Sequence, residues 1–265
     1  MNPEGSIDFK GLTGGVVFIK GLLDKMDVNA QIIRHGKYKS AIEPLIGDKM
    51  SEANKEQTLA FVSSIWNHIS GEISKARNIE QARLQVYADS LMSQTAEDAL
   101  KYKFADKIVY RDQLLDLLKE KTGKKETEKV EFVSLESYTN VPLSESKKRA
   151  KDKIAVIYAT GEIGSGDGSE ESIGSDKISK AIRDARLDDD IKAIVFRVNS
   201  PGGSALASEV ILREAKLARE KKPFIVSMGD YAASGGYYIA CAADSILASP
   251  TTLTGSIGVF GVIPD

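Results

Sequence analysis

A single serine, Ser234, stands among small residues where a strand-like run meets a helix-like run. The sequence at residues 232–236 is AASGG, and it follows the apolar run at 222–226. In acyl-transfer enzymes a nucleophilic serine often occupies such a strand-to-helix turn, because the turn exposes the hydroxyl and the helix N-terminus offers free N–H groups. The alternative interpretation is an N-cap serine on a tightly packed helix, which would need no substrate.

A second glycine-rich loop, NSPGGS at residues 199–204, follows the apolar run at 191–198. Such a loop can direct backbone N–H groups to the carboxyl ends of parallel strands, where ligands bind in open α/β sheets. Taken alone, it also fits an ordinary turn that begins a helix. Two such loops on successive strands can together supply a nucleophile and an oxyanion hole.

The residue that would accept the proton from Ser234 is harder to choose. The chain has two histidines, His35 and His68. His68 falls on a predicted helix beside apolar residues, and no acid is evidently placed to orient His35, so a Ser-His-Asp triad is poorly supported. A lysine can act as the base where burial lowers its pKa by several units from about 10.4.

Two patterns of elements surround these loops. In the first half, apolar spacing predicts helices at 14–26, 51–77, 79–92, 95–104 and 111–121, with short strands at 30–34 and 105–109. In the second half, strands at 154–158, 191–198, 224–228 and 245–248 alternate with helices at 175–187, 203–221 and 234–243, with a loop at 161–174. Because continuously apolar strands that alternate with helices are typical of a parallel sheet covered on both faces, we expect an α/β fold.

The composition narrows the class of protein. With 265 residues, 42% apolar content and a net charge of −2, the chain can form one large or two modest domains and offers no basic surface for nucleic acid. Its single cysteine, Cys241, excludes a disulfide within the chain, and its alanine neighbours predict that it is buried. No run is long and apolar enough to span a bilayer, and the chain stops within an apolar, glycine-rich stretch. We therefore expect a fragment whose membrane anchor lies outside it.

Four motifs, in chain order, resemble those of the signal peptide peptidase A family, the bacterial membrane-bound proteases also called protease IV. They are GKYKSAIEP at 36–44, NSPGGS at 199–204, AASGGY at 232–237 and LTGSIG at 253–258. The resemblance runs over most of the chain, and the first motif is that of the long, double-domain form. It implies a Clp-protease/crotonase-like fold of two tandem repeats, both incomplete here. Residues 1–120 would be the latter part of the first repeat, 121–152 a charged connection, and 153–265 the early part of the second.

The same resemblance implies a Ser–Lys dyad, with the lysine in the first repeat and the serine in the second. Carried over by motif, Ser234 is the nucleophile and Lys39 is the general base. Lys37 is a rival two residues away, but the family's lysine follows the tyrosine of the motif.

The resemblance also implies the rest of the site and its setting. The backbone N–H groups of Gly235 and Gly202 would bind the oxyanion, and the hydroxyl of Ser256 would hold the base lysine. The substrates would be cleaved signal peptides and other apolar peptides. The protein would be a homotetramer of the bacterial inner membrane, with its catalytic part facing the periplasm or the cell exterior. We expect no metal and no organic cofactor.

Two other functions fit parts of the pattern. An acyl-CoA-processing enzyme of crotonase-like fold would need paired oxyanion donors but no serine nucleophile, so Ser234 counts against it. A non-catalytic assembly subunit would use both glycine-rich loops for packing alone, which leaves the serine and lysine of the motifs unexplained.

Overall fold

The computed structural model describes residues 1–141 and 151–265, and part of the charged connection predicted at 121–152 lies outside them. Contacts group the chain into two compact units. We call Met1–Thr13 with Trp66–Lys148 the helical unit, and Gly14–Ile65 with Arg149–Asp265 the sheet unit. Ser234 and Lys39 both belong to the sheet unit.

The helical unit contains the end of the long helix α3 (Glu52–Arg77), followed by α4 (Gln81–Asp89), α5 (Ala96–Lys101), α6 (Arg111–Thr122) and α7 (Leu135–Thr139). A capping box begins α5, since Thr95 Oγ1 accepts from the N–H of Asp98 while the Asp98 carboxylate accepts from the N–H of Thr95. The strand predicted at 105–109 was wrong. The N–H of Ala105 donates back to Ala99 O in α5, and within 105–109 only the N–H of Val109 donates to another segment, at Met1 O.

The sheet unit is built on a parallel sheet, as predicted. The order is β2 (Lys153–Thr160), β5 (Ile191–Ser200), β6 (Phe224–Ala233) and β7 (Ser245–Leu247), and β8 (Leu253–Gly255) pairs with the far end of β6. Thus β6 pairs with β7 in its first half and with β8 in its second. This double pairing extends β6 five residues beyond the predicted end at 228.

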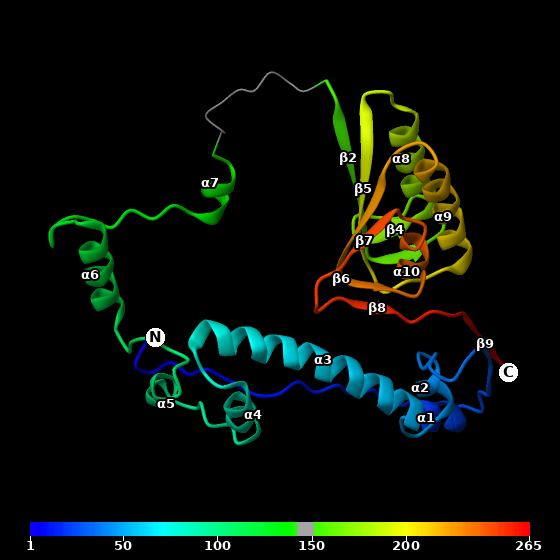
Figure 1. Cartoon of the computed structure of the whole chain (residues 1–265). Coiled ribbons are helices and arrows are strands. Elements are labelled where there is room, and N and C mark those ends of the chain that lie inside the picture. The colour runs from blue at the N-terminus through cyan, green and yellow to red at the C-terminus, as the bar shows by residue number, and fades with distance from the viewer. Residues whose placement is uncertain (142–150) are drawn as a thin grey trace. The chain divides into compact units, whose positions relative to one another are not determined.

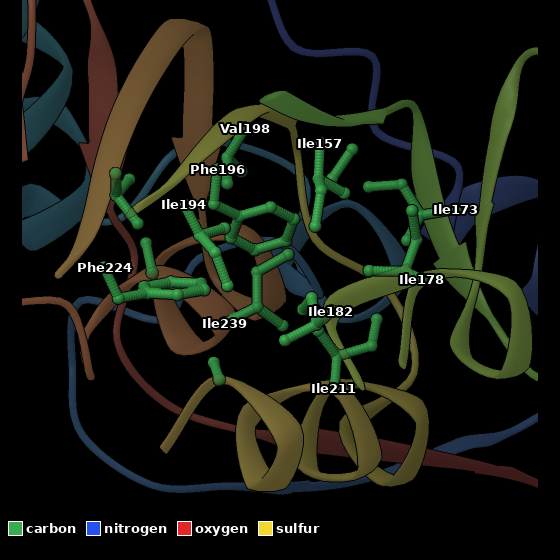
Figure 2. Close-up of a cluster of buried hydrophobic side chains, with 14 of the residues drawn as sticks. Ile157, Ile173, Ile178, Ile182, Ile194, Phe196, Val198, Ile211, Phe224 and Ile239 are labelled. Carbon is green, nitrogen blue, oxygen red and sulfur yellow. The ribbon is translucent and has the colours of Figure 1, made fainter. Parts of the chain in front are cut away.

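Three helices follow the strands: α8 (Ser175–Leu187), α9 (Ala205–Arg219) and α10 (Gly235–Ala240). Helices α8 and α9 pack against each other beside the sheet (Figure 1). Figure 2 shows the resulting core, in which isoleucines of α8 and α9 meet Phe196 and Phe224 from β5 and β6. Both phenylalanines are fully buried, and burial of each side chain favours folding by about 1.5–3 kcal/mol.

Two expectations about burial were wrong. The sheet is not covered on both faces within the described residues, because Ile154, Val156 and Tyr158 of β2 are 64%, 51% and 68% exposed. Cys241 is also exposed. It comes directly after α10 ends, and its neighbours Ala240 and Ala242 take the buried positions.

The predicted loop at 161–174 contains two short strands, β3 (Glu162–Gly164) and β4 (Ser172–Gly174), which pair in parallel. In β3, the N–H of Ile163 donates to Gly202 O and its carbonyl accepts from Ser204 N–H, both at 2.8 Å. Gly203 lies between these contacts with φ of +148°, and a Cβ there would be 2.2 Å from Ile163 O. The second glycine of NSPGGS is therefore required by this close approach.

The N-terminal part of the sheet unit holds α1 (Lys20–Lys25), β1 (Ala30–Arg34), α2 (Glu43–Ile46) and the start of α3. Helix α1 is shorter than predicted, because residues 14–19, which include two glycines and β-branched residues, do not form helix. Strand β1 pairs antiparallel with β9 (Phe260–Pro264), so that Ala30 lies opposite Pro264. This pairing joins the two ends of the sheet unit.

Candidate active site

Ser234 occupies the sharp turn between β6 and α10. Its backbone has φ of 54° and ψ of −116°, a conformation that non-glycine residues rarely adopt. The turn is held by a hydrogen bond from the N–H of Ser234 to Gly255 O (2.8 Å) and by another from the N–H of Tyr238 to Ser234 O (2.9 Å). Strained backbone of this kind occurs at active sites, where it presents a side chain to a ligand.

Lys39 lies next to Ser234, although the two residues are near opposite ends of the sheet unit's sequence. Lys39 Nζ lies 3.0 Å from Ser234 Oγ, although 195 residues separate the two in the chain. The same Nζ donates to Ser256 O at 2.7 Å and to Ser256 Oγ at 3.0 Å. Lys39 as a whole is only 4% exposed. The structure thus brings together the three residues that the motifs singled out.

The strand pairings explain this meeting. Ala233 at the end of β6 lies opposite Gly255 at the end of β8, so Ser234 and Ser256 leave the sheet side by side. Strand β9 begins four residues after Ser256, and its partner β1 ends five residues before Lys39. The β1–β9 pairing therefore brings the lysine to the two serines.

Burial lowers the pKa of Lys39 from its usual value of 10.5. Among the described residues, no carboxylate forms an ion pair with its amine. The ammonium form has three N–H donors for the three oxygens around it. The neutral amine keeps two donors for Ser256 O and Oγ, and its lone pair is left facing the hydroxyl of Ser234.

The glycine-rich loops supply backbone donors beside Ser234. The N–H of Gly235 is in the first turn of α10, where N–H groups have no partner within the helix. The N–H of Gly202 instead donates to Ser200 Oγ at 3.1 Å, which counts against its predicted role. Gly203 lines the cavity beside Ser234 and Gly235, and none of the hydrogen bonds found among the described residues uses its N–H, which makes it a second candidate donor. The sequence PGG offers two adjacent glycines and no means of choosing between them.

A cavity of about 750 Å³ opens beside Ser234. Most of its lining side chains are apolar or aromatic; they include Tyr237, Tyr238, Ile257, Val259 and Phe260. Tyr238 is fixed by a hydrogen bond from its hydroxyl to Glu209 at 2.6 Å. The tyrosines that follow SGG and the isoleucine of LTGSIG thus form part of this wall.

None of the hydrogen bonds found among the described residues joins a histidine to Ser234 or Lys39. His35 lines the cavity. His68 belongs to the helical unit. Across residues 1–141 and 151–265, no three His, Cys, Asp or Glu side chains are grouped so that they could hold a metal ion. In the same residues no helix is both long and apolar enough to cross a membrane.

A serine at a strained strand-to-helix turn, in contact with a buried lysine and next to an apolar cavity, is suited to acyl transfer as in serine hydrolases. Comparison with known families agrees. The chain belongs to Peptidase family S49, a family of serine peptidases whose model matches residues 1–125 and 216–265. The family resemblance seen in the four motifs is therefore confirmed.

The chain is 42% identical to Protease 4 of Salmonella typhi and 37% identical to Protease 4 of Haemophilus influenzae. These alignments cover 99% and 100% of this chain but 43% and 44% of the relatives, so the chain spans under half of their length. Among solved structures, a variant of the 1510-N membrane-bound stomatin-specific protease is 27% identical over 41% of this chain and 49% of its own, with a TM-score of 0.34.

Proposed function

We propose that this chain carries the nucleophile and the base of a serine endopeptidase that works through Ser234 and Lys39. The observation that carries the proposal is the 3.0 Å contact between Lys39 Nζ and Ser234 Oγ at a buried lysine. Acyl-CoA chemistry on a related fold would not need this contact. A packing role for the loop would not need a buried amine with a lowered pKa beside the hydroxyl.

In the proposed reaction, neutral Lys39 accepts the hydroxyl proton of Ser234 while Oγ attacks the carbonyl carbon of a peptide bond. The N–H groups of Gly235 and of Gly203, in place of Gly202, donate to the oxyanion that forms. The tetrahedral intermediate then releases the amine of the cleaved peptide, which takes a proton from the Lys39 ammonium. Water hydrolyses the acyl-enzyme with Lys39 again as base, and Ser256 keeps the Lys39 amine aligned throughout.

We further propose that the substrates are cleaved signal peptides and other apolar peptides. The aromatic and aliphatic lining of the cavity supports this class, because an apolar segment is stabilised there by leaving water. A homotetramer at the bacterial inner membrane, with the catalytic part on its outer side, is proposed from the family resemblance.

The fold proposal is Clp-protease/crotonase-like, with two tandem repeats that correspond to residues 1–120 and 153–265. The alternation of parallel strands and helices in the second range supports it. The helical unit and the sheet unit are defined by contacts within each unit, and they do not test whether the chain contains two repeats. The sequence Gly-Ser-Ile occurs at 5–7 and again at 255–257. Superposition of these two segments and their surroundings in a full-length structure tests the repeats, and unrelated strand orders would exclude them.

The test of the dyad uses a fluorophosphonate probe and peptide hydrolysis with the 265-residue chain and the full-length protein. Ser234→Ala and Lys39→Ala should each abolish both signals, because a nucleophile and its base act as a unit. Lys37→Ala is the matched control: it changes a lysine of the same loop whose Nζ lies over the Tyr38 ring at 4.8 Å. Full activity of Lys39→Ala would refute the assignment.

A further inference from the structure

Glu43, at the start of α2, has a buried carboxylate that the reaction above does not use. The residue is 5% exposed. Its carboxylate accepts from the N–H of Ser51 (3.1 Å), from the hydroxyl of Ser51 (2.6 Å) and from Asn54 Nδ2 (3.0 Å). Ser51 and Asn54 are at the N-terminus of α3, so the carboxylate ties α2 to that helix.

Helix capping alone does not explain this carboxylate. Ser51 Oγ already accepts from the N–H of Asn54 at 3.2 Å, which caps α3. Burial opposes the charge on Glu43, but hydrogen bonds from Ser51 and Asn54 and the charge of Arg34 lower its pKa below the usual value. The ionised Glu43 carboxylate therefore accepts three hydrogen bonds at the N-terminus of α3, although Ser51 already caps that helix.

Two contacts connect Glu43 to the loop that carries Lys39, one from its carboxylate and one from its backbone N–H. Arg34 Nη1 lies 3.8 Å from Glu43 Oε1 and donates a long hydrogen bond of 3.5 Å to Lys39 O. The N–H of Glu43 donates to Ser40 O at 3.0 Å, and Ser40 Oγ accepts from Gln57 of α3 at 2.7 Å. The backbone that follows the Cα of Lys39 is thus connected to Glu43 through Arg34 and through the Glu43 N–H, and Ser40 Oγ connects it directly to α3.

We propose that Glu43 is a positioning residue for Lys39, and this inference rests on the proposed function. Its carboxylate holds Arg34 and the residue's own position in α2 to the N-terminus of α3, and Arg34 and the Glu43 N–H in turn hold Lys39 O and Ser40 O. The carboxylate therefore fixes the backbone from which the Lys39 side chain extends. A displacement of about 1 Å at a reacting group costs about 100-fold in rate. Loss of Glu43 should therefore slow acylation of Ser234 and leave substrate binding nearly unchanged.

The experiment compares Glu43→Ala and Glu43→Gln with wild type in the full-length protein. Measured quantities are kcat and KM for a peptide, the rate of phosphonylation of Ser234, and the melting temperature. Glu43→Ala should lower kcat and the phosphonylation rate about 100-fold, with KM changed by less than about twofold. Glu43→Gln keeps an oxygen acceptor of the same length and should restore part of the rate.

Asp98→Ala is the matched control for stability, because Asp98 is also a carboxylate at a helix N-terminus but lies in the helical unit. It should lower the melting temperature while leaving kcat unchanged. The inference is overturned if folded Glu43→Ala and Glu43→Gln both keep the wild-type kcat. It is equally overturned if Asp98→Ala loses as much kcat for the same loss of stability.

Ser234→Ala in the same assay separates the two levels of proposal. If Ser234→Ala is inactive while both Glu43 variants are fully active, this inference alone fails. If Ser234→Ala stays active, the proposed function fails, and the role of Glu43 fails with it. Should Glu43→Ala not fold, Glu43→Gln decides between these outcomes.

Discussion

Replacement of Ser256 separates the two hydrogen bonds that it accepts from Lys39. Ser256→Ala removes Oγ, at 3.0 Å from Lys39 Nζ, but leaves the carbonyl at 2.7 Å. A hydrogen bond to a neutral group is worth about 0.5–1.5 kcal/mol, and the base reacts as the neutral amine. Since 1.36 kcal/mol corresponds to a factor of ten, kcat/KM should fall about 2- to 13-fold. Lys39→Ala, in contrast, removes the base and should abolish activity.

Ser256→Gly should show the same loss of rate but a different stability. Ser256 has φ of 49°, a left-handed conformation that costs a non-glycine residue about 1–2 kcal/mol. Glycine avoids this cost but loses about 0.5–1 kcal/mol through its greater freedom in the unfolded chain. Relief of strain is the larger effect, so Ser256→Gly should be more stable than Ser256→Ala by about 0.5–1 kcal/mol.

Phosphonylation rates and peptide hydrolysis measure the first effect, and urea unfolding of the two variants measures the second. If Ser256→Ala is as inactive as Lys39→Ala, the hydroxyl is indispensable and the carbonyl does not hold the lysine. If Ser256→Gly is the less stable variant, the strain attributed to this residue is absent.

Three further predictions follow from the site. Burial lowers the pKa of Lys39, so activity should rise with pH through that lowered value in a pH–rate profile. Between that lowered pKa and 10.5 the unfolded chain binds more protons than the folded chain, so the free energy of unfolding in urea should rise with pH over this range. A fall with pH in the activity or in the free energy of unfolding would contradict the proposed base. Gly202→Ala should abolish labelling of Ser234 by the fluorophosphonate probe and lower the melting temperature. The reason is that φ is +112° and a Cβ would be 2.8 Å from Gly235 N and from Ser234 Cβ. Gly261→Ala, whose Cβ would meet nothing within 4 Å, is the control that should be tolerated. Profiling against a peptide library should show small or apolar residues beside the cut bond, and a strong preference for Lys or Arg there would exclude an apolar groove.

Much of the sheet unit could be predicted from the sequence, because its elements follow local rules. Helix α8 has the predicted bounds, Ser175–Leu187, since its apolar residues recur at helical spacing. Strand β6 was predicted too short, because its second half is a strand only through its pairing with β8. The pairing of β1 with β9 was not predicted at all, because nothing local to either segment indicates its partner.

The residues of the candidate site also differ in how far the local sequence could predict them. Ser234 could be singled out from its neighbours alone, since small residues at a strand-to-helix junction are a local signal. Lys39 could be named only through the family resemblance, because its burial depends on segments that are remote in sequence. The sequence could not distinguish Gly203, the donor proposed here, from Gly202, because the contacts of these two glycines depend on Ile163 and Ser200.

The pairing of β1 with β9 has a consequence for synthesis of the chain. A ribosome makes Lys39 early, but the two oxygens of Ser256 and the strand that pairs with β1 come more than two hundred residues later. No N-terminal piece of the chain that stops short of Ser256 contains all the groups that contact the amine. The proposed dyad therefore cannot form on the ribosome until β9 has been made and has paired with β1.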